Sequence, residues 1–130
     1  MKTLLLIEDH PDMRENTMEI LELAGYKVIT AENGRAGIDA ALKTIPDLII
    51  CDVMMPEMDG FELLSNIRRD PALENLPVIM LTAKAQDRDV LEGYTRGADM
   101  YLTKPFNPIE LVTFAKRLLQ SGADDGRTVI

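Results

Sequence analysis

Short apolar segments alternate with segments of helical spacing along the whole chain, and this order limits the fold more than any other feature. Five segments have the apolar character of strands: Thr3–Ile7, Lys27–Ala31, Leu48–Cys51, Val78–Leu81 and Met100–Leu102. Five others place apolar residues at helical spacing: Pro11–Ala24, Gly34–Lys43, Phe61–Arg69, Asp87–Arg96 and Pro108–Gln120. Strict alternation predicts an α/β fold, a doubly wound five-stranded parallel sheet flanked by five helices.

The length and charge of the chain narrow its class further. Its 130 residues suit a single domain, which we expect over residues 1–121, with 122–130 as a flexible tail or the start of a linker. The net charge of −8 argues against direct nucleic-acid binding and against docking on an anionic membrane. The single cysteine, Cys51, lies in an apolar run, and no apolar segment has the length of a signal peptide or membrane span. These features predict a cytoplasmic protein.

Polar residues stand at the carboxyl ends of the predicted strands. Glu8 and Asp9 follow the first strand, Asp52 the third, Thr82 the fourth and Lys104 the fifth. In an open parallel sheet the carboxyl ends meet at one edge, where ligand sites form. We therefore expect these side chains to converge.

Three converging carboxylates need a positive partner, because like charges about 4 Å apart repel by about 4 kcal/mol at an effective dielectric near 20. Lys104 supplies one charge, and Mg²⁺, which prefers carboxylate oxygens, would supply the rest. Zinc is not expected, since His10 alone cannot form a Cys/His set. Each residue taken singly also has an ordinary interpretation: Asp9 or His10 could begin a helix, Asp52 could form an Asx turn, and Lys104 could be solvated. Thr82 could likewise cap the next helix.

Four blocks of sequence resemble the receiver domain of bacterial two-component response regulators, a flavodoxin-like fold, over about residues 3–120. The matching blocks, in order, are Leu5-Leu6-Ile7-Glu8-Asp9-His10, Asp52-Val53-Met54-Met55-Pro56-Glu57-Met58-Asp59-Gly60, Leu81-Thr82-Ala83 and Leu102-Thr103-Lys104-Pro105-Phe106. Their joint occurrence at predicted strand ends makes the resemblance specific, and it points to a chemotaxis-type single receiver.

The resemblance implies roles for the residues at the strand ends. Asp52 would be the phosphoacceptor, and Glu8, Asp9 and Asp52 would hold Mg²⁺ together with the main-chain carbonyl of Met54. Glu8 stands where many family members have Asp, so it would reach the ion through water. His10 is interpreted as a residue that begins a helix.

The resemblance also implies how phosphorylation is read out. Thr82 would hydrogen-bond the phosphoryl group, Lys104 would pair with it, and Tyr101 would be the switch aromatic that turns inward when Thr82 moves. The Lys104–Pro105 bond would be cis. The response would appear on the surface of the fourth helix, fifth strand and fifth helix.

The expected partners follow from the same family. The phosphoryl donor would be a sensor histidine kinase or a histidine phosphotransfer protein, and the output would pass to an effector protein or a fused output domain. Phosphorylation-dependent dimerisation stays open, as does the choice between a stand-alone receiver and one excised from a longer regulator. We expect a phosphoacceptor switch rather than an enzyme, with at most self-phosphorylation from small donors and self-dephosphorylation.

Two other functions use similar parts. A haloacid-dehalogenase-type enzyme also has a nucleophilic Asp, a Thr, a Lys and Mg²⁺, but it needs a second Asp where this chain has Met54, and its nucleophile follows the first strand. A flavin-binding module would need a Ser/Thr/Gly-rich loop after the first strand, where this chain has Glu8-Asp9-His10. Phosphomonoester turnover or bound flavin absorbance would favour these alternatives.

Overall fold

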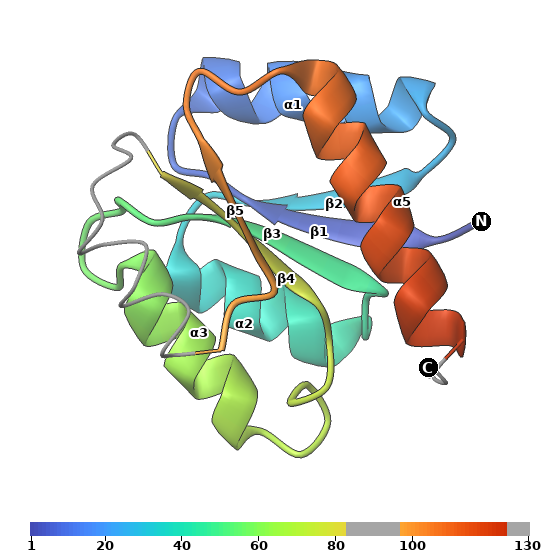
Figure 1. Cartoon of the computed structure of the whole chain (residues 1–130). Coiled ribbons are helices and arrows are strands. Elements are labelled where there is room, and N and C mark those ends of the chain that lie inside the picture. The colour runs from blue at the N-terminus through green and yellow to red at the C-terminus, as the bar shows by residue number, and fades with distance from the viewer. Residues whose placement is uncertain (83–96, 125–130) are drawn as a thin grey trace.

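The computed structural model describes residues 1–82 and 97–124, and its elements alternate between strands and helices (Figure 1). The strands are β1 (Thr3–Ile7), β2 (Lys27–Ala31), β3 (Leu48–Asp52), β4 (Val78–Thr82) and β5 (Met100–Thr103). The helices are α1 (Pro11–Leu23), α2 (Gly34–Lys43), α3 (Gly60–Arg69) and α5 (Pro108–Asp124). The predicted helix Asp87–Arg96 lies outside the described residues.

The five strands form one parallel sheet in the order β2-β1-β3-β4-β5. β2 is added on one side of β1, whereas β3, β4 and β5 are added in turn on its other side. The switch in strand order therefore lies between β1 and β3. Helices α1 and α5 cover one face, while α2 and α3 cover the other (Figure 1). The predicted doubly wound sheet is confirmed.

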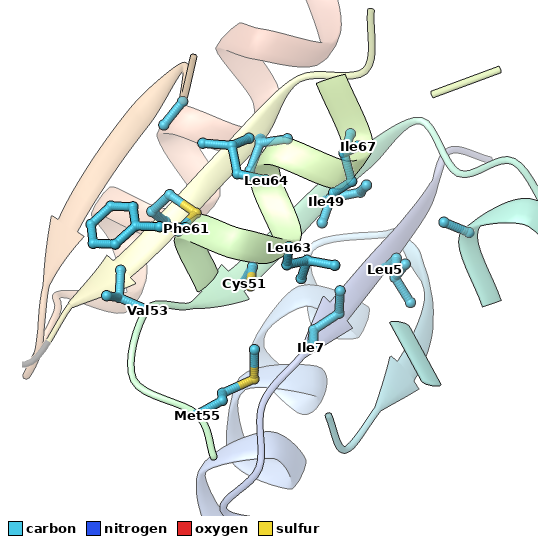
Figure 2. Close-up of a cluster of buried hydrophobic side chains, with 14 of the residues drawn as sticks. Leu5, Ile7, Ile49, Cys51, Val53, Met55, Phe61, Leu63, Leu64 and Ile67 are labelled. Carbon is cyan, nitrogen blue, oxygen red and sulfur yellow. The ribbon is translucent and has the colours of Figure 1, made fainter. Parts of the chain in front are cut away.

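Two hydrophobic clusters, one on each face, hold the layers together. Alternate residues of the central strands serve them: Leu5 and Ile49 face the α2/α3 side, whereas Leu4 and Leu48 face the α1/α5 side. Figure 2 shows the first cluster, to which α3 contributes Leu63, Leu64 and Ile67 and strands β1 and β3 contribute Leu5, Ile7 and Ile49. Burial of β3 and β4 on both faces explains their continuous apolar sequence.

Several elements end later than the sequence predicted. Strands β3, β4 and β5 each continue one residue further, so that Asp52, Thr82 and Thr103 are their last residues. Asp52 is held in the ladder opposite Leu81, whose carbonyl accepts a hydrogen bond of 2.8 Å from the Val53 amide. The polar side chain therefore does not end the strand, because backbone pairing continues.

The helix bounds differ by small amounts. α1 ends at Leu23 instead of Ala24, and α3 begins at Gly60, with Asp59 as its N-cap. α5 continues to Asp124, past the predicted end at Gln120. The longer helix includes Gly122, and a glycine within a helix costs about 1 kcal/mol relative to alanine. The four helical turns before Gly122 offset this cost. The division between domain and tail stays a prediction.

None of the helices in the described ranges has both the length and the apolar character that a bilayer span requires.

Candidate functional site

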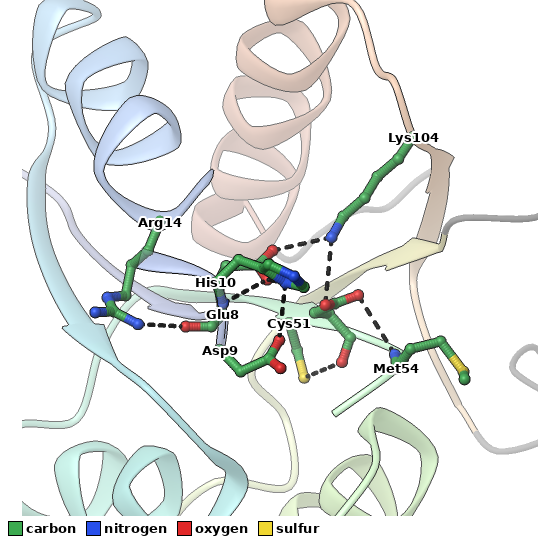
Figure 3. Close-up of polar contacts among 8 residues, drawn as sticks. Glu8, Asp9, His10, Arg14, Cys51, Met54 and Lys104 are labelled. Atoms are coloured by element: carbon green, nitrogen blue, oxygen red, sulfur yellow. Dashed lines mark hydrogen bonds and ion pairs between the residues drawn. The ribbon is translucent and has the colours of Figure 1, made fainter. Parts of the chain in front are cut away.

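An ion-pair network joins the ends of three strands at the carboxyl edge of the sheet (Figure 3). The Lys104 ammonium lies 3.0 Å from Glu8 Oε1 and 3.2 Å from Asp52 Oδ2. The side chains of Glu8 and Asp52 are only 1% and 5% exposed, and that of Lys104 is 15% exposed. The predicted convergence of these three residues is therefore observed, and Lys104 is not a solvated loop lysine.

Backbone hydrogen bonds fix the strand ends that carry this network. The amide of Glu8 donates to the Ala31 carbonyl at 3.0 Å, which continues the pairing of β1 with β2. The amide of Lys104 donates to the Thr82 carbonyl at 2.6 Å, which continues the pairing of β5 with β4. The functional side chains thus extend from the ends of rigid elements.

The buried charges shift the acid strength of Asp52 and Lys104. Burial, followed by the neighbouring Glu8 carboxylate, raises the pKa of Asp52 to about 6, although Lys104 opposes this shift. Burial by itself would lower the pKa of Lys104, but contacts with Glu8 and Asp52 outweigh it, so this pKa is raised. Asp52 is therefore mostly a carboxylate at neutral pH, held beside a charged ammonium.

Asp9 and the chain after Asp52 complete the edge of this pocket. Asp9 follows Glu8 directly, and its Oδ1 atom is buried without a hydrogen-bond partner among the described residues. The amide of Met54 donates to Asp52 Oδ1 over a long 3.4 Å, an Asx-turn contact. The Met54 side chain is 68% exposed, so it borders the pocket on the solvent side.

The expected switch residues lie on the two neighbouring strands. Thr82 is the last residue of β4 and is buried, next to the end of β3 that carries Asp52. Tyr101 lies in β5 opposite Met80, is half-buried, and packs against the cluster on the α2/α3 face. The Lys104–Pro105 peptide bond is cis, as the resemblance implies.

Two further residues, His10 and Arg14, make contacts near the acidic pair that the sequence did not predict. His10 is the N-cap residue of α1, as predicted, but its side chain makes no capping hydrogen bond. Its Nδ1 atom lies 3.7 Å from Glu8 Oε2 and 3.6 Å from Asp9 Oδ1. Arg14 donates from its guanidinium to the Glu8 carbonyl at 2.8 Å and so ties α1 to the end of β1. In the sequence, only the adjacency of Glu8, Asp9 and His10 could have indicated that the His10 ring lies near the two carboxylates.

The loop after Asp52 closes tightly on β3, and Gly60 makes this possible. Its amide donates to the Val53 carbonyl at 2.8 Å. A Cβ atom at this position would lie 2.6 Å from the Asp52 carbonyl oxygen and 2.8 Å from Val53 Cα. Any larger residue would therefore displace the backbone that carries Asp52.

The donor set fits a hard divalent cation. Three carboxylates, those of Glu8, Asp9 and Asp52, stand near one ammonium, so their charges are only partly compensated within the described chain. Asp9 Oδ1 offers a lone pair without a hydrogen-bond partner there. Oxygen-rich, acidic and open to solvent through Asp9, the pocket has the chemistry that Mg²⁺ requires.

Comparison with known proteins agrees with this geometry. The model of the response regulator receiver domain matches residues 4–116. Response regulator Rre1 of Synechocystis is 39% identical over 95% of this chain and 55% of its own length. The phosphate regulon transcriptional regulatory protein PhoB of Pseudomonas aeruginosa is 39% identical over 99% of this chain and 57% of its own length. The chain thus spans about half the length of these curated relatives.

Solved structures give the same result over almost the full chain. The signal receiver domain of a signal transduction histidine kinase from Syntrophus aciditrophicus has 39% identity and a TM-score of 0.88, covering 100% of this chain and 98% of that one. Chemotaxis protein CheY4 of Vibrio cholerae has 36% identity and a TM-score of 0.86, covering 91% and 98%. The chain belongs to the response regulator receiver domain family of two-component systems.

Proposed function

We propose that Asp52 is the phosphoacceptor of this receiver domain and that Mg²⁺ is required for its phosphorylation. The observation that carries the proposal is the contact of Asp52 Oδ2 with the Lys104 ammonium at 3.2 Å, beside Glu8. The Asp52 carboxylate is buried at a strand end, where it is positioned by the sheet rather than by a loop.

The roles of the pocket residues follow from the chemistry of phosphoryl transfer. Asp52 supplies the attacking oxygen, and Lys104 offsets negative charge on the phosphoryl oxygens. Glu8, Asp9, Asp52 and the Met54 carbonyl would hold the cation, and Glu8 would reach it through water. When bound, Mg²⁺ neutralises charge on the transferred group and orients it.

The proposed reaction balances without an additional reagent. The oxygen–phosphorus bond to Asp52 forms as the phosphorus–nitrogen bond of a donor phosphohistidine breaks, and the released imidazole nitrogen takes a proton from solvent. Hydrolysis of the acyl phosphate returns Asp52 to a carboxylate. The chain thus acts as a switch that is set and reset, rather than as a turnover enzyme.

The switch is read through Thr82 and Tyr101. Thr82 would bond a phosphoryl oxygen, and its movement would leave space for the Tyr101 ring to turn inward. Phosphorylation adds about −1.5 to −2 charge units, which can shift an element only if two arrangements are accessible. We propose that the ring of Tyr101, which is half-buried and packs against the α2/α3 cluster, is such an element. Part of the proposed surface, its fourth helix, lies outside the described residues.

The partners are proposed by class. A sensor histidine kinase or histidine phosphotransfer protein supplies the phosphoryl group, and an effector or fused output domain receives the signal. The chain itself is proposed not to bind nucleic acid or membrane, in a cytoplasmic setting. Dimerisation on phosphorylation stays open.

Intact-mass analysis after incubation with acetyl phosphate and Mg²⁺ tests the acceptor. Wild type is expected to gain one labile phosphoryl group, and Asp52→Asn none. Asp59→Asn is the matched control, because Asp59 lies in the same loop and its Oδ1 atom accepts from the Glu62 amide, a bond that asparagine preserves. An equal adduct on Asp52→Asn would remove the assignment.

Removal of Lys104 tests the coupling between phosphorylation and output. In Lys104→Ala we expect phosphorylation to occur with little change in the Tyr101 ring resonances, whereas wild type shows a clear change on phosphorylation. Lys43→Ala, at the exposed end of α2, is the control. Wild-type changes at Tyr101 in Lys104→Ala, or unchanged partner binding, would contradict the role of Lys104.

A further inference from the structure

Helices α2 and α3 lie side by side on one face of the sheet (Figure 1), and a groove runs between them. Two cavities of about 210 and 330 Å³ make up this α2/α3 groove, and both are lined by Arg35 of α2 and by Met58 of the loop before α3. The floor of the groove is apolar, because Met58 and Ile38 are half-buried and pack against the hydrophobic cluster between these helices and the sheet.

The residues that line the α2/α3 groove follow helical spacing. Glu62, Asn66 and Asp70 occur at every fourth position along α3 and at its C-cap, so they share one face. Ile38 and Asp39 of α2 line the opposite side. The stretch from Glu62 to Asp70 is about 12 Å long at a rise of about 1.5 Å per residue, which matches about two turns of an incoming helix.

The walls of the α2/α3 groove carry more negative than positive charge. Four carboxylates line it against a single guanidinium, that of Arg35; the carboxylates are those of Asp39, Glu57, Glu62 and Asp70. None of these five groups makes an ion pair with another residue in the described part of the chain. Unpaired carboxylates around an apolar floor are complementary to a partner that is both cationic and apolar.

We propose that the α2/α3 groove is a docking surface for a basic amphipathic helix of a partner protein. Apolar side chains at positions i, i+3 or i+4, and i+7 of that helix pack on Met58 and Ile38, and its lysines or arginines pair with the carboxylates on the walls. The flexible, polarisable side chain of Met58 adapts to apolar groups of different shape.

The α2/α3 groove lies beyond the proposed function. Its two cavities are lined by none of the residues of the phosphorylation pocket, so docking is expected whether or not Asp52 carries a phosphoryl group. A second copy of this chain is disfavoured as the occupant, because its net charge of −8 would be repelled by the acidic walls.

A synthetic peptide of leucine and lysine tests the proposal on the intact chain. The probe has about 18 residues, with leucines at helical spacing and lysines elsewhere. Its affinity is measured by fluorescence anisotropy, and its position by changes in amide resonances. We expect the changes to centre on Ile38, Met58 and Asn66, and we expect no binding when glutamate replaces lysine. Changes spread equally over the acidic residues of α1 would overturn the proposal.

Two double variants with the same change of net charge test the walls of the groove. Asp39→Asn with Glu62→Gln should weaken peptide binding about three- to tenfold, as the loss of two surface ion pairs predicts. Glu19→Gln with Glu22→Gln, at exposed positions of α1, is the matched control and should leave the affinity nearly unchanged. Equal losses in both double variants would assign binding to net charge and overturn the docking surface.

Met58→Ala tests the apolar floor. It should weaken binding of the leucine–lysine peptide by about fivefold or more, the loss typical of an anchoring contact, and leave binding of an oligolysine peptide unchanged. Amide spectra confirm that the variant is folded. Equal wild-type affinity for the two peptides would overturn the proposal. Changes in the groove resonances on raising the protein concentration alone would assign the groove to a second copy and overturn it as well.

Discussion

The two edges of the sheet each hold a cluster of charged groups. Within the described chain, only the cluster at the amino edge has its charged groups fully paired. At the amino edge, Arg68 of α3 donates to the carbonyls of Glu74, Leu76 and Gly97, and to the Asp99 carboxylate at 2.9 Å. Asp99 Oδ2 also accepts from the Val78 amide at 2.8 Å. This set of residues, the Arg68 clamp, joins α3 to the start of β4 and β5.

At the carboxyl edge, the charges do not balance in the same way. Lys104 alone faces the carboxylates of Glu8 and Asp52, with Asp9 nearby, and Asp9 Oδ1 has no hydrogen-bond partner among the described residues. The hydrogen bonds of the Arg68 clamp hold elements of the fold together. The acidic pocket instead keeps an excess of negative charge, and binding of a cation or a phosphoryl group would change this balance. We therefore expect the amino edge to contribute to stability and propose that the carboxyl edge carries the phosphorylation site.

The largest expected effect on stability comes from breaking the clamp. Arg68→Ala should lower the free energy of unfolding by about 2–4 kcal/mol, because it removes bonds to three carbonyls and one carboxylate. Denaturant unfolding measures this, with Arg69→Ala as the matched control, since Arg69 is exposed and bonds only Asn66 in the described structure. The folded variant should still be phosphorylated in the presence of Mg²⁺. Loss of phosphorylation in folded Arg68→Ala would contradict the separation of the two edges.

A smaller effect of opposite sign is expected at the pocket. In metal-free protein at pH 7, Asp52→Asn should raise the free energy of unfolding by about 1–3 kcal/mol, since it removes a buried carboxylate whose pKa is raised to about 6. Because that folded value lies above the unfolded value of about 3.9, wild-type stability contributed by this group falls as pH rises from about 4 to about 6. The variant should lose this dependence. Unfolding curves across that range measure both effects, and a less stable Asp52→Asn would contradict the account.

The smallest expected effect concerns backbone strain. The left-handed φ of +97° at the clamp is taken by Gly97, whereas the loop beside the pocket has Glu57 at +68°. Left-handed backbone costs most residues about 1–2 kcal/mol, and asparagine tolerates it better. Glu57→Asn should therefore stabilise the protein by about 0.5 kcal/mol, measured by thermal unfolding. Glu57→Ala, which removes the charge but keeps the strain, should not stabilise; equal gains in both would assign the effect to charge.

The sequence predicted the parts of this molecule that depend on local pattern. The apolar runs of β3 and β4, with residues buried on both faces, defined the sheet, and the rule that parallel strands end at one edge brought Glu8, Asp52 and Lys104 together. The extra strand residue at Asp52 was missed because pairing with Leu81 outweighs the polar side chain.

Contacts that depend on long side chains could not be predicted. Arg68 donates to the carbonyl of Gly97, which is 29 residues away. Because every residue has a main-chain carbonyl, the sequence does not indicate which one accepts. The approach of His10 to Asp9 depends on where α1 begins and on the direction of one side chain, neither of which spacing alone determines. The clamp and the imidazole contact therefore needed the structure.

Chemical trapping locates the phosphoryl group most directly. Protein treated with acetyl phosphate and Mg²⁺ is reduced with borohydride, which converts an aspartyl phosphate to homoserine, and the modified position is found by peptide mapping. Homoserine at position 52 alone, and only when Mg²⁺ is present, is the predicted result. Homoserine at Asp9 or Asp59, or the same yield at position 52 without a divalent cation, would contradict a cation-dependent acceptor at the end of β3.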